Sequence, residues 1–465
     1  FRMRLFLVTP FIFLSLLSAG AADNRKENES LKAEALFVWG YPLVKNIQAM
    51  DAVMNGSLPM LGQVGVNRFS HARRTMRPED RFVSPNIDVL FSVAILDLTD
   101  SPIELEVPAT SGQYYVLQFI DPWTNSFAYL GKRSTGTKAG KYLVVGPEYS
   151  SAVSEEPEFC KDRVIRSPQN LALAVLRISI SNATSIDYLH SLQKGFKIRC
   201  LVDEKCPYAN PFDSAPIEGN NFWVLLRWAL ERFTSPKDET ELVEIATELL
   251  AEKELGTSSV LNKPILLSAQ NSGLKKIESL ALNGGYKGKS GWRSLIDLFN
   301  YNRSNFSIGA LEEPNWIIAD KHDAFLKRAL AARIGLWGNH GYEATFFEAW
   351  TDAKGQQLFG KNKYLLTLSS PIPAKAFWSV TNYSAPEFFL YENNENKYAI
   401  SSYDKDLVRN ADGSVTIIFS HDRPSDTAAN WLPTPKGSFR PLLSIYQPDL
   451  SEIRRYQPDP IEALP

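Results

Sequence analysis

Residues able to do acid-base chemistry occur early in the chain, in the segment SPNIDVLFS. Asn86 and Asp88 are two positions apart, so on a strand both side chains would face one side of a sheet. Such a pair could orient a substrate, with Asp88 as a general acid or base. The structural alternative is an Asx turn at the entry to the strand, directly after Pro85.

A second group of polar and aromatic residues follows in YYVLQFIDPWTN. Tyr114, Asp121 and Trp123 combine aromatic rings with a carboxylate, a mixture that suits sugars and small polar organic ligands. Asp121 is the second candidate for a general acid or base. The dipeptide Asp121-Pro122 is also an ordinary turn signal, so a structural role is the alternative.

The next loop, GKRSTGT, is a candidate anion site. It places Arg133 and Thr135 between glycines, where a guanidinium and backbone amides could hold a carboxylate or phosphate. The loop lacks the P-loop spacing G-x-x-x-x-G-K-[ST], so the sequence gives only weak support for nucleotide binding.

The second half of the chain adds four candidates. His340 lies where a helical pattern gives way to a β pattern, a common place for functional residues, although a lone histidine is more often structural. Trp378 occurs in FWSVTNYS and could contact a ligand. Asn430 and Trp431, in an expected loop before the last strand, could line a pocket or instead cap the final hairpin.

Standard catalytic signatures are missing from the sequence. It contains no G-x-S-x-G elbow, no HExxH, no CxxC pair and no dinucleotide-binding G-x-G-x-x-G after a strand. The five histidines lack metal-ligand spacing, so no metal ligands are predicted. The sequence therefore leaves any cofactor unknown.

Two classes of function follow from these residues. The first is a hydrolase or lyase, cofactor-independent or metal-assisted, acting on a small polar or carbohydrate-like molecule in a pocket between domains. The second is a non-catalytic or structural protein that binds carbohydrates or small ligands by stacking them on Trp123, Trp378 and Trp431. The sequence does not decide whether the chain is an enzyme.

The start of the chain predicts a secretory signal peptide. Met3-Arg4 precedes the apolar run LFLVTPFIFLSLLSAG, and Ala19 and Ala21 have the spacing of a cleavage site. We expect residues 1–21 to be removed, since the run is shorter than the ~20 residues of a membrane span. An uncleaved anchor is the alternative. The expected location is extracellular or the lumen of the secretory pathway, with no membrane contact after cleavage.

Other features fit a secreted glycoprotein. Six N-x-S/T sequons occur, at Asn28, Asn55, Asn182, Asn302, Asn305 and Asn382. Cys200 and Cys206 are close enough for a small disulfide loop, which leaves Cys160 free or paired elsewhere; three reduced thiols are the alternative.

Composition limits the partners. The chain has 465 residues, 44% of them hydrophobic, which is enough for two or three domains with their own cores. A formal net charge of −2 gives no reason to expect nucleic acid as a partner. A small-molecule or carbohydrate ligand is expected, and a homo-oligomer is left open.

The order of patterns predicts an α+β, β-rich fold with two antiparallel sandwich-like, or jelly-roll-like, parts and a helical middle. A helix interrupted or kinked at Gly40-Tyr41-Pro42 comes first, followed by short β-rich runs up to Val145. Helical patterns follow from about Ser181, including GWRSLIDLFNYN. From Glu343 the β pattern returns. We expect an N-terminal β-rich domain at 29–196, a helical region at 197–332 and a C-terminal sandwich at 333–450.

Several long motifs also carry a family resemblance. They are PNIDVLFSVAILDL, GQYYVLQFIDPWTNSFAYLGKRSTGTKAGKYLVVGP, FWSVTNYS and NWLPTPKGSFRPLLSIYQP. The chain resembles proteins that pair the domains of unknown function 1254, here roughly 33–196, and 1214, here roughly 333–448. The resemblance implies β-sandwich domains with helices between them, and it implies no activity.

Overall fold

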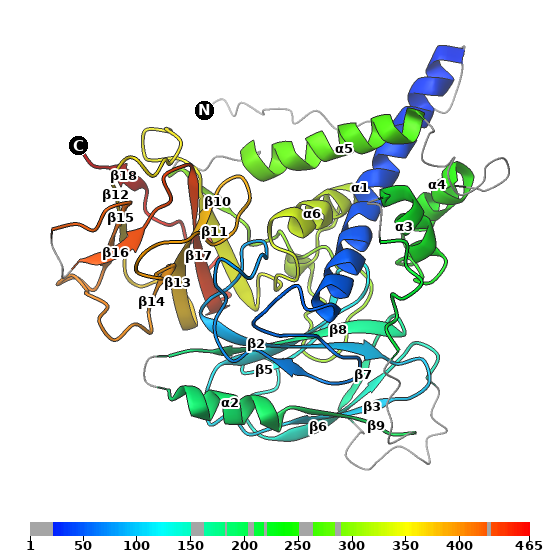
Figure 1. The fold of residues 1–465 in the computed structure, drawn as a ribbon, viewed down its shortest axis with the longest axis horizontal. Coiled ribbons are helices and arrows are strands. Elements are labelled where there is room, and N and C mark those ends of the chain that lie inside the picture. Colours follow the sequence, from blue (N-terminus) through cyan, green and yellow to red (C-terminus); the bar gives the residue numbers. More distant parts are fainter. Residues whose placement is uncertain are drawn as a thin grey trace.

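The computed structural model of this chain describes residues 22–149, 162–181, 184–202, 209–217, 221–250, 264–283, 290–425 and 429–465. The predicted signal peptide, Cys160, Cys206 and the sequon at Asn182 lie outside these ranges. Two β-sandwiches and a group of helices make up the described chain (Figure 1). The α+β, β-rich fold predicted from the sequence is confirmed, and the exact domain boundaries stay predictions.

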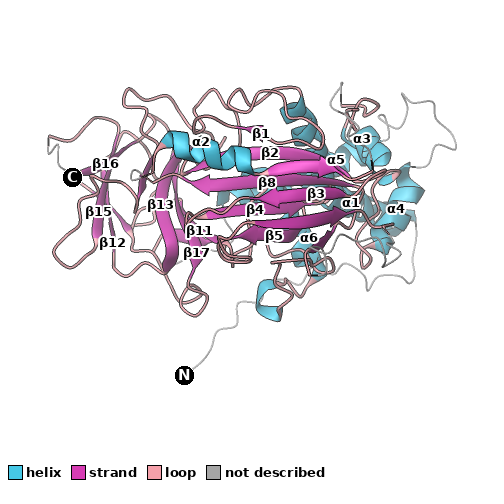
Figure 2. Ribbon diagram, turned by 90° about the horizontal axis from the view of Figure 1, so that it is seen from below, coloured by secondary structure: helices cyan, strands magenta, loops and turns pink. Residues whose placement is uncertain are grey.

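The N-terminal sandwich consists of two sheets. The five-stranded sheet has the order β1-β2-β8-β4-β5, whose strands lie side by side in Figure 2, and the four-stranded sheet has the order β7-β6-β3-β9. Pairing is antiparallel except between β6 and β7. The elements are β1 (Ser70–His71), β2 (Val89–Asp97), β3 (Ile103–Val107), β4 (Tyr115–Ile120), β5 (Ser126–Gly131), β6 (Gly140–Val145), β7 (Val164–Arg166), β8 (Leu171–Ser179), α2 (Ile186–Gly195) and β9 (Lys197–Cys200).

The five-stranded sheet is buried on both faces, which explains why its strands are almost continuously apolar. Side chains of a strand alternate between faces. In β2, Leu90 and Ala94 enter the core between the two sheets of this sandwich. Val93 and Ile95 enter the larger core shared with the helices and the C-terminal sandwich. A charged side chain on this second face is therefore buried between the domains.

The C-terminal sandwich repeats this arrangement of five and four strands. The orders are β10-β11-β17-β13-β14 and β16-β15-β12-β18, antiparallel except for β15 with β16. The strands are β10 (Trp292–Ser294), β11 (Ala344–Ala349), β12 (Tyr364–Leu368), β13 (Ala374–Ser384), β14 (Ala399–Ser401), β15 (Val415–Ser420), β16 (Asn430–Pro433), β17 (Phe439–Pro448) and β18 (Ile461–Ala463).

The helices lie between and beside the sandwiches (Figure 1). They are α1 (Ala22–Met54), α3 (Phe222–Leu230), α4 (Thr240–Leu250), α5 (Pro264–Asn283), the short 3-10 helix η3 (Pro314–Trp316) and α6 (Lys321–Ile334). Helix α1 includes Pro42 and is not interrupted there, contrary to one of the two expectations. No described helix is long and apolar enough to cross a membrane.

The helix expected at GWRSLIDLFNYN is wrong. Trp292–Ser294 is strand β10, which pairs with β11, and the residues that follow form turns. Several apolar side chains of this segment are buried in the large core. Pairing with the C-terminal sheet and this burial override a weak helical pattern.

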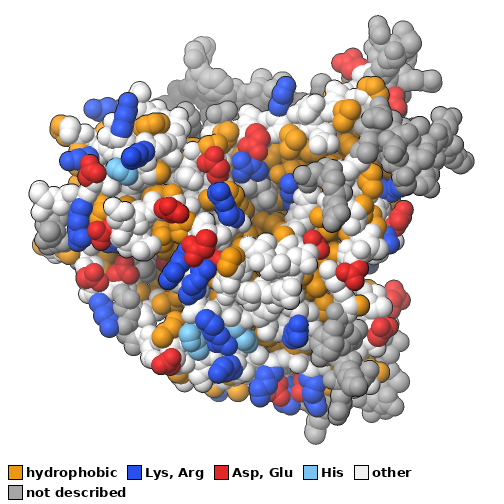
Figure 3. All heavy atoms as spheres, in the orientation of Figure 1, with side chains coloured by type: hydrophobic (Ala, Val, Ile, Leu, Met, Phe, Trp, Pro, Cys, Tyr) orange, Lys and Arg blue, Asp and Glu red, His pale blue; other side chains and the backbone are white. Residues whose placement is uncertain are grey.

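Charged side chains of both signs are interspersed on the described surface visible in Figure 3. Lys and Arg total 50 and Asp and Glu total 52, so the two signs nearly balance over the chain. The buried seam between the sandwiches, rather than this surface, holds the distinctive polar groups.

Candidate binding site between the domains

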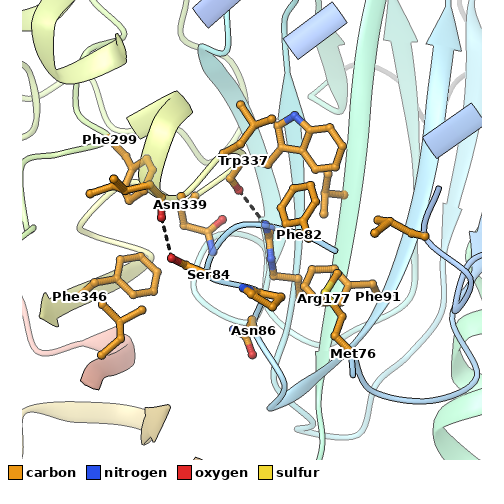
Figure 4. Close-up of a pocket in the computed structure, with 18 of the residues that line it drawn as sticks. Met76, Phe82, Ser84, Asn86, Phe91, Arg177, Phe299, Trp337, Asn339 and Phe346 are labelled. Atoms are coloured by element: carbon orange, nitrogen blue, oxygen red, sulfur yellow. Dashed lines mark hydrogen bonds between the residues drawn. The ribbon is translucent and has the colours of Figure 1, made fainter. Parts of the chain in front are cut away.

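A cavity of about 90 Å³ lies at the seam between the two sandwiches (Figure 4). Its wall comes from the loop before β2, from β2 and β8, from the connection between α6 and β11, and from β17. Most of the wall is apolar, with contributions from Met60, Met76, Phe82, Val175, Leu298 and Phe346. The polar side chains in the wall are few, which is typical of small-molecule sites.

Arg177 is the most informative polar residue of this wall. It follows Leu173 and Val175 on the inter-domain face of β8 and is 7% exposed. Its guanidinium donates to Gln118 Oε1 at 2.7 Å and to the carbonyl oxygen of Trp337 at 2.7 Å, the second bond being drawn in Figure 4. Both acceptors are neutral. Burial lowers the pKa of Arg177, an effect that neighbouring tyrosine hydroxyls and Glu343 oppose.

No carboxylate of the described chain forms an ion pair or hydrogen bond with Arg177. The guanidinium instead lies near the ring of Phe91, 5.4 Å from its centroid. Buried charges in proteins are normally paired, because transfer of an uncompensated ion out of water is costly. Arg177 is therefore a positive group in the cavity wall whose counter-ion the described residues do not supply.

Arg440, the second arginine of the wall, differs because it contacts a carboxylate, Glu348, which it shares with Arg293. It lies on β17, donates to Glu348 Oε2 at 2.5 Å, and also bonds to Ser84 Oγ. Glu348 accepts from Arg293 as well. Arg440 Nε has no partner among the residues that the structure describes.

Two asparagines complete the polar part of the wall. Asn86 is engaged, since its Nδ2 donates to Tyr446 Oη and its Oδ1 accepts from the backbone N–H of Asp88 at 2.8 Å. That second bond is an Asx turn before β2, so the turn alternative for Asn86 and Asp88 is confirmed. Asn339 lies next to Ser84 and Trp337 in Figure 4. Its Oδ1 is buried and has no partner within the described ranges.

Three predicted residues meet in a polar group deeper in the same seam. Tyr114 donates to Glu343 Oε1 at 3.0 Å, and Arg133 forms an ion pair with the other oxygen of that carboxylate. His340 Nδ1 lies 2.8 Å from Tyr129 Oη. Burial, together with the charge of Arg133, lowers the pKa of His340 to about 3, so its ring is neutral. The carboxylate that Arg133 holds in this structure is that of Glu343, and binding of a ligand anion at this loop stays a prediction.

Asp88 lies at the seam but is absent from the cavity wall. Its carboxylate accepts from Ser379 Oγ of the C-terminal sandwich at 2.5 Å. Burial raises the pKa of Asp88 to about 7, although the bond from Ser379 opposes the shift. Burial thus favours the protonated form of this carboxyl group, which does not line the cavity.

Asp121 and Trp123 lie elsewhere, on the side facing α1. Asp121 accepts from the backbone and side-chain nitrogens of Asn125 at 2.8 and 3.0 Å, which closes the turn between β4 and β5. Burial raises its pKa to about 7. Trp123 packs on Trp39, with ring centroids 4.5 Å apart, and donates to the carbonyl oxygen of Thr234. Neither residue reaches the cavity wall.

The other predicted binding residues have structural contacts. Trp378 is buried in β13. Asn430 lies in β16 and not in a loop; it bonds to the backbone of Val408 and Thr416, and Trp431 donates to the carbonyl oxygen of Ser420. Thr135 Oγ1 accepts from the Gly131 N–H within its own turn. None of these side chains lines the cavity.

The structure bears on two features expected of a secreted glycoprotein, the glycosylation sequons and the disulfide. Asn302 and Asn382 are 1% and 0% exposed and donate hydrogen bonds to backbone oxygens, so neither side chain is accessible to a glycan in this fold. Cys200 ends β9 and is disulfide-bonded. Cys206 lies outside the described residues, so the pairing of these two cysteines stays a prediction.

Sequence reasoning missed the residues that matter most at the cavity. Arg177 interrupts the apolar strand LALAVLRIS, and Arg440 and Glu348 are likewise isolated charges in apolar strands. A lone charge in a fully buried strand is a usable signal, because such a residue needs a partner or a function.

Fold and site together define a protein of two β-sandwiches with a largely apolar, arginine-containing cavity at their seam. The chain belongs to the family that carries two domains, each described as a protein of unknown function: domain 1254 matches residues 66–200 and domain 1214 matches residues 343–450. No curated protein matches the chain.

One solved structure resembles most of this chain in fold. The VPA0106 protein of Vibrio parahaemolyticus is 20% identical, with 94% of this chain and 100% of that chain covered and a TM-score of 0.63. At this identity the likeness supports the fold alone. An uncharacterised protein of Burkholderia cenocepacia is 11% identical over 97% of this chain and 91% of that chain, with a TM-score of 0.45.

Proposed function

We propose that this protein binds a small molecule with an apolar body and one anionic group, a carboxylate, sulfonate or phosphate, in the cavity between the sandwiches. Arg177 holds the anionic group. Apolar side chains such as Val175 and Phe346 contact the rest of the molecule.

The observation that carries the proposal is the missing counter-ion of Arg177. Its two bonds to neutral acceptors fix the guanidinium plane, and no carboxylate of the described residues contacts it. A planar guanidinium matches the geometry of a carboxylate or phosphate, and charge-assisted hydrogen bonds are about twice as strong as neutral ones. A bound anion would therefore supply the counter-ion that Arg177 lacks among the described residues.

The lining and size of the cavity narrow the ligand class. A mostly apolar wall offers few hydrogen bonds to a sugar, so the ligand differs from the carbohydrate-like molecule expected from the sequence. An engineered apolar cavity of about 150 Å³ holds benzene. This cavity, at about 90 Å³, suits short organic acids.

Hydrolase or lyase activity is a second proposal, supported by Asp88. Its pKa near 7 suits a general acid or base at neutral pH. Asn86, two residues earlier, lines the cavity. Asp88 itself does not line the cavity, so this second proposal requires the substrate to extend past Asn86 to the Asp88 carboxyl group. In that case Asp88→Asn should abolish turnover of esters of the bound acids while leaving acid binding intact. We also propose that the protein is secreted, and the apolar run near its N-terminus supports this.

Calorimetry with acetate, propanoate and butanoate, and with the matching alcohols, tests the binding proposal. We expect at least one acid to bind and its alcohol to bind at least about tenfold more weakly, as loss of a charged hydrogen-bond partner predicts. Arg177→Met should lose the preference for acids. The matched control is Arg163→Met, an exposed arginine of the N-terminal sandwich outside the cavity wall.

Two results would overturn the proposal. One is equal binding of acids and alcohols by the unmodified protein, and the other is unchanged acid affinity in Arg177→Met. Circular dichroism and the unfolding temperature establish that the variant is folded. Removing a buried charge without a counter-ion is not expected to unfold the chain.

A further inference from the structure

Asn339 is a polar side chain of the cavity wall that the proposed anionic ligand does not explain. It belongs to the connection between α6 and β11 and is 2% exposed. Its Oδ1 has no partner among the described residues. The other small polar side chains of the wall are engaged: Ser84 donates to the Ile334 carbonyl oxygen at 2.7 Å, and Asn86 is held by Tyr446 and the Asx turn.

We infer that the ligand is a hydroxy acid, whose hydroxyl group bonds to the side-chain amide of Asn339. This inference rests on the proposed binding of an apolar acid in the cavity. Buried amides almost always have hydrogen-bond partners, because leaving one unpaired forfeits the bonds it made to water. An amide offers both a donor and an acceptor, and a hydroxyl can satisfy either one. A hydroxyl group is therefore a suitable partner for Asn339 in either orientation of the side-chain amide.

The position of Asn339 places the hydroxyl close to the acid group. Arg177 donates to the carbonyl oxygen of Trp337, two residues before Asn339. Figure 4 shows Trp337 and Asn339 on the same side of the cavity. The two recognition points thus belong to one short stretch of backbone, which favours a hydroxyl on the second or third carbon of the acid.

The connection between α6 and β11 can hold Asn339 in position for hydroxyl recognition because hydrogen bonds fix it at several points. The Gly338 carbonyl oxygen accepts from Gln118 Nε2 at 2.9 Å, and the His340 N–H donates to Tyr129 Oη at 3.1 Å. Both neighbours of Asn339 are thereby tied to the N-terminal sandwich. A recognition group held by rigid neighbours gives sharper discrimination than one on a free loop.

Calorimetry with propanoate and its α-hydroxy and β-hydroxy derivatives tests the inference. The unmodified protein should bind one hydroxy acid about tenfold more tightly than propanoate. Asn339→Leu, of similar size, should bind propanoate normally and lose this preference. Asn315→Leu, at an exposed asparagine of η3, is the matched control and should keep it.

Each outcome has a distinct meaning. If propanoate binds but neither hydroxyl improves affinity, or if Asn339→Leu keeps the preference, the inference is wrong and the proposed binding of acids stands. If the unmodified protein binds none of the three acids in this test, both fail. Loss of the preference for acids in Arg177→Met, together with loss of only the hydroxyl preference in Asn339→Leu, supports both.

Discussion

Arg133 and Glu343 form an ion pair that joins the two sandwiches. Arg133 follows β5 of the N-terminal sandwich, and Glu343, with a side chain 1% exposed, directly precedes β11 of the C-terminal one. Tyr114 donates to the same carboxylate, so two charge-assisted hydrogen bonds cross the seam at one residue. Glu343 is consequently a point where the relative position of the domains is fixed.

Glu343→Gln should destabilise the protein strongly, because it leaves Arg133 without a counter-ion at a mostly buried site. Breaking one partner of a buried pair typically costs about 3–5 kcal/mol in the free energy of unfolding. Urea unfolding measures this loss.

The matched control for Glu343→Gln is Glu395→Gln, which breaks an exposed pair with Arg423 and should change stability by less than about 0.5 kcal/mol. Adding Arg133→Met to Glu343→Gln should recover part of the loss. Equal effects of the two Glu→Gln changes would contradict the buried role of Glu343.

Asp88 should make stability fall as the pH rises. Its pKa is about 7 in the folded protein and 3.8 in a model compound, so the folded state binds the proton more tightly. This contribution is complete below about pH 4 and is lost as the pH rises to about 7. Asp88→Asn should reduce the decline of the unfolding temperature across this range.

The decline will not vanish in Asp88→Asn, because Asp121 has a pKa shifted in the same direction. The double variant Asp88→Asn/Asp121→Asn should flatten it further. Asp422→Asn, at an exposed aspartate, is the control and should leave the profile unchanged. A profile identical to that of the unmodified protein in Asp88→Asn would exclude this contribution.

His340 should have the opposite effect on the pH dependence of stability: its contribution should be lost as the pH falls. Its pKa is lowered from 6.5 to about 3, so the folded state favours the neutral ring. The stability from this preference is present above about pH 6.5 and is lost as the pH falls toward 3. His340→Asn, which can still bond to Tyr129, should remove this share of the acid destabilisation whatever its effect at neutral pH.

Thermal unfolding of His340→Asn between pH 3 and pH 7 checks the expectation, with the exposed His322→Asn as control. The quantity compared is the change of unfolding temperature with pH, not its absolute value. An unchanged acid slope in His340→Asn, with a changed slope in His322→Asn, would reverse the assignment.

Strands were predictable because their signal is local. The run FSVAILDL and the turn residues around it indicate β2, and the structure places β2 at Val89–Asp97. The segment containing β10 was predicted as a helix because its apolar residues have helical spacing. Pairing with β11 decides its conformation instead. Periodicity reports burial and does not identify which distant strand a segment joins.

The candidate site was less predictable because distant residues build it. Arg177 and Trp337 are 160 positions apart, and Arg133 and Glu343 are 210 apart. Arg133 was selected from the sequence as a possible anion ligand, but nothing in the sequence indicated Glu343 as the carboxylate that it contacts. Whether an arginine is paired or awaits a ligand depends on tertiary neighbours, which one sequence does not reveal.

Gly309 provides a prediction about the chain segment that covers the edge of β5. The Tyr129 N–H donates to the Ile308 carbonyl oxygen at 2.8 Å, and Gly309 follows with φ +75°. A Cβ at Gly309 would lie 2.1 Å from the Tyr129 carbonyl oxygen. Arg133 also donates to the Gly309 carbonyl oxygen at 2.6 Å. Gly309→Ala must therefore displace this segment from β5 and weaken the hold on Arg133.

Gly355→Ala separates the clash from backbone strain. Gly355 has φ +78°, nearly the same as Gly309, but a Cβ there would meet nothing within 4 Å. Each variant carries the cost of a left-handed alanine, about 1–2 kcal/mol, and only Gly309→Ala adds a collision with backbone. Urea unfolding should therefore show a clearly larger loss for Gly309→Ala, and hydrogen exchange should show faster exchange at the Tyr129 amide in that variant alone. Equal losses, with Tyr129 still protected, would mean that the segment moves aside freely and does not help to hold the seam.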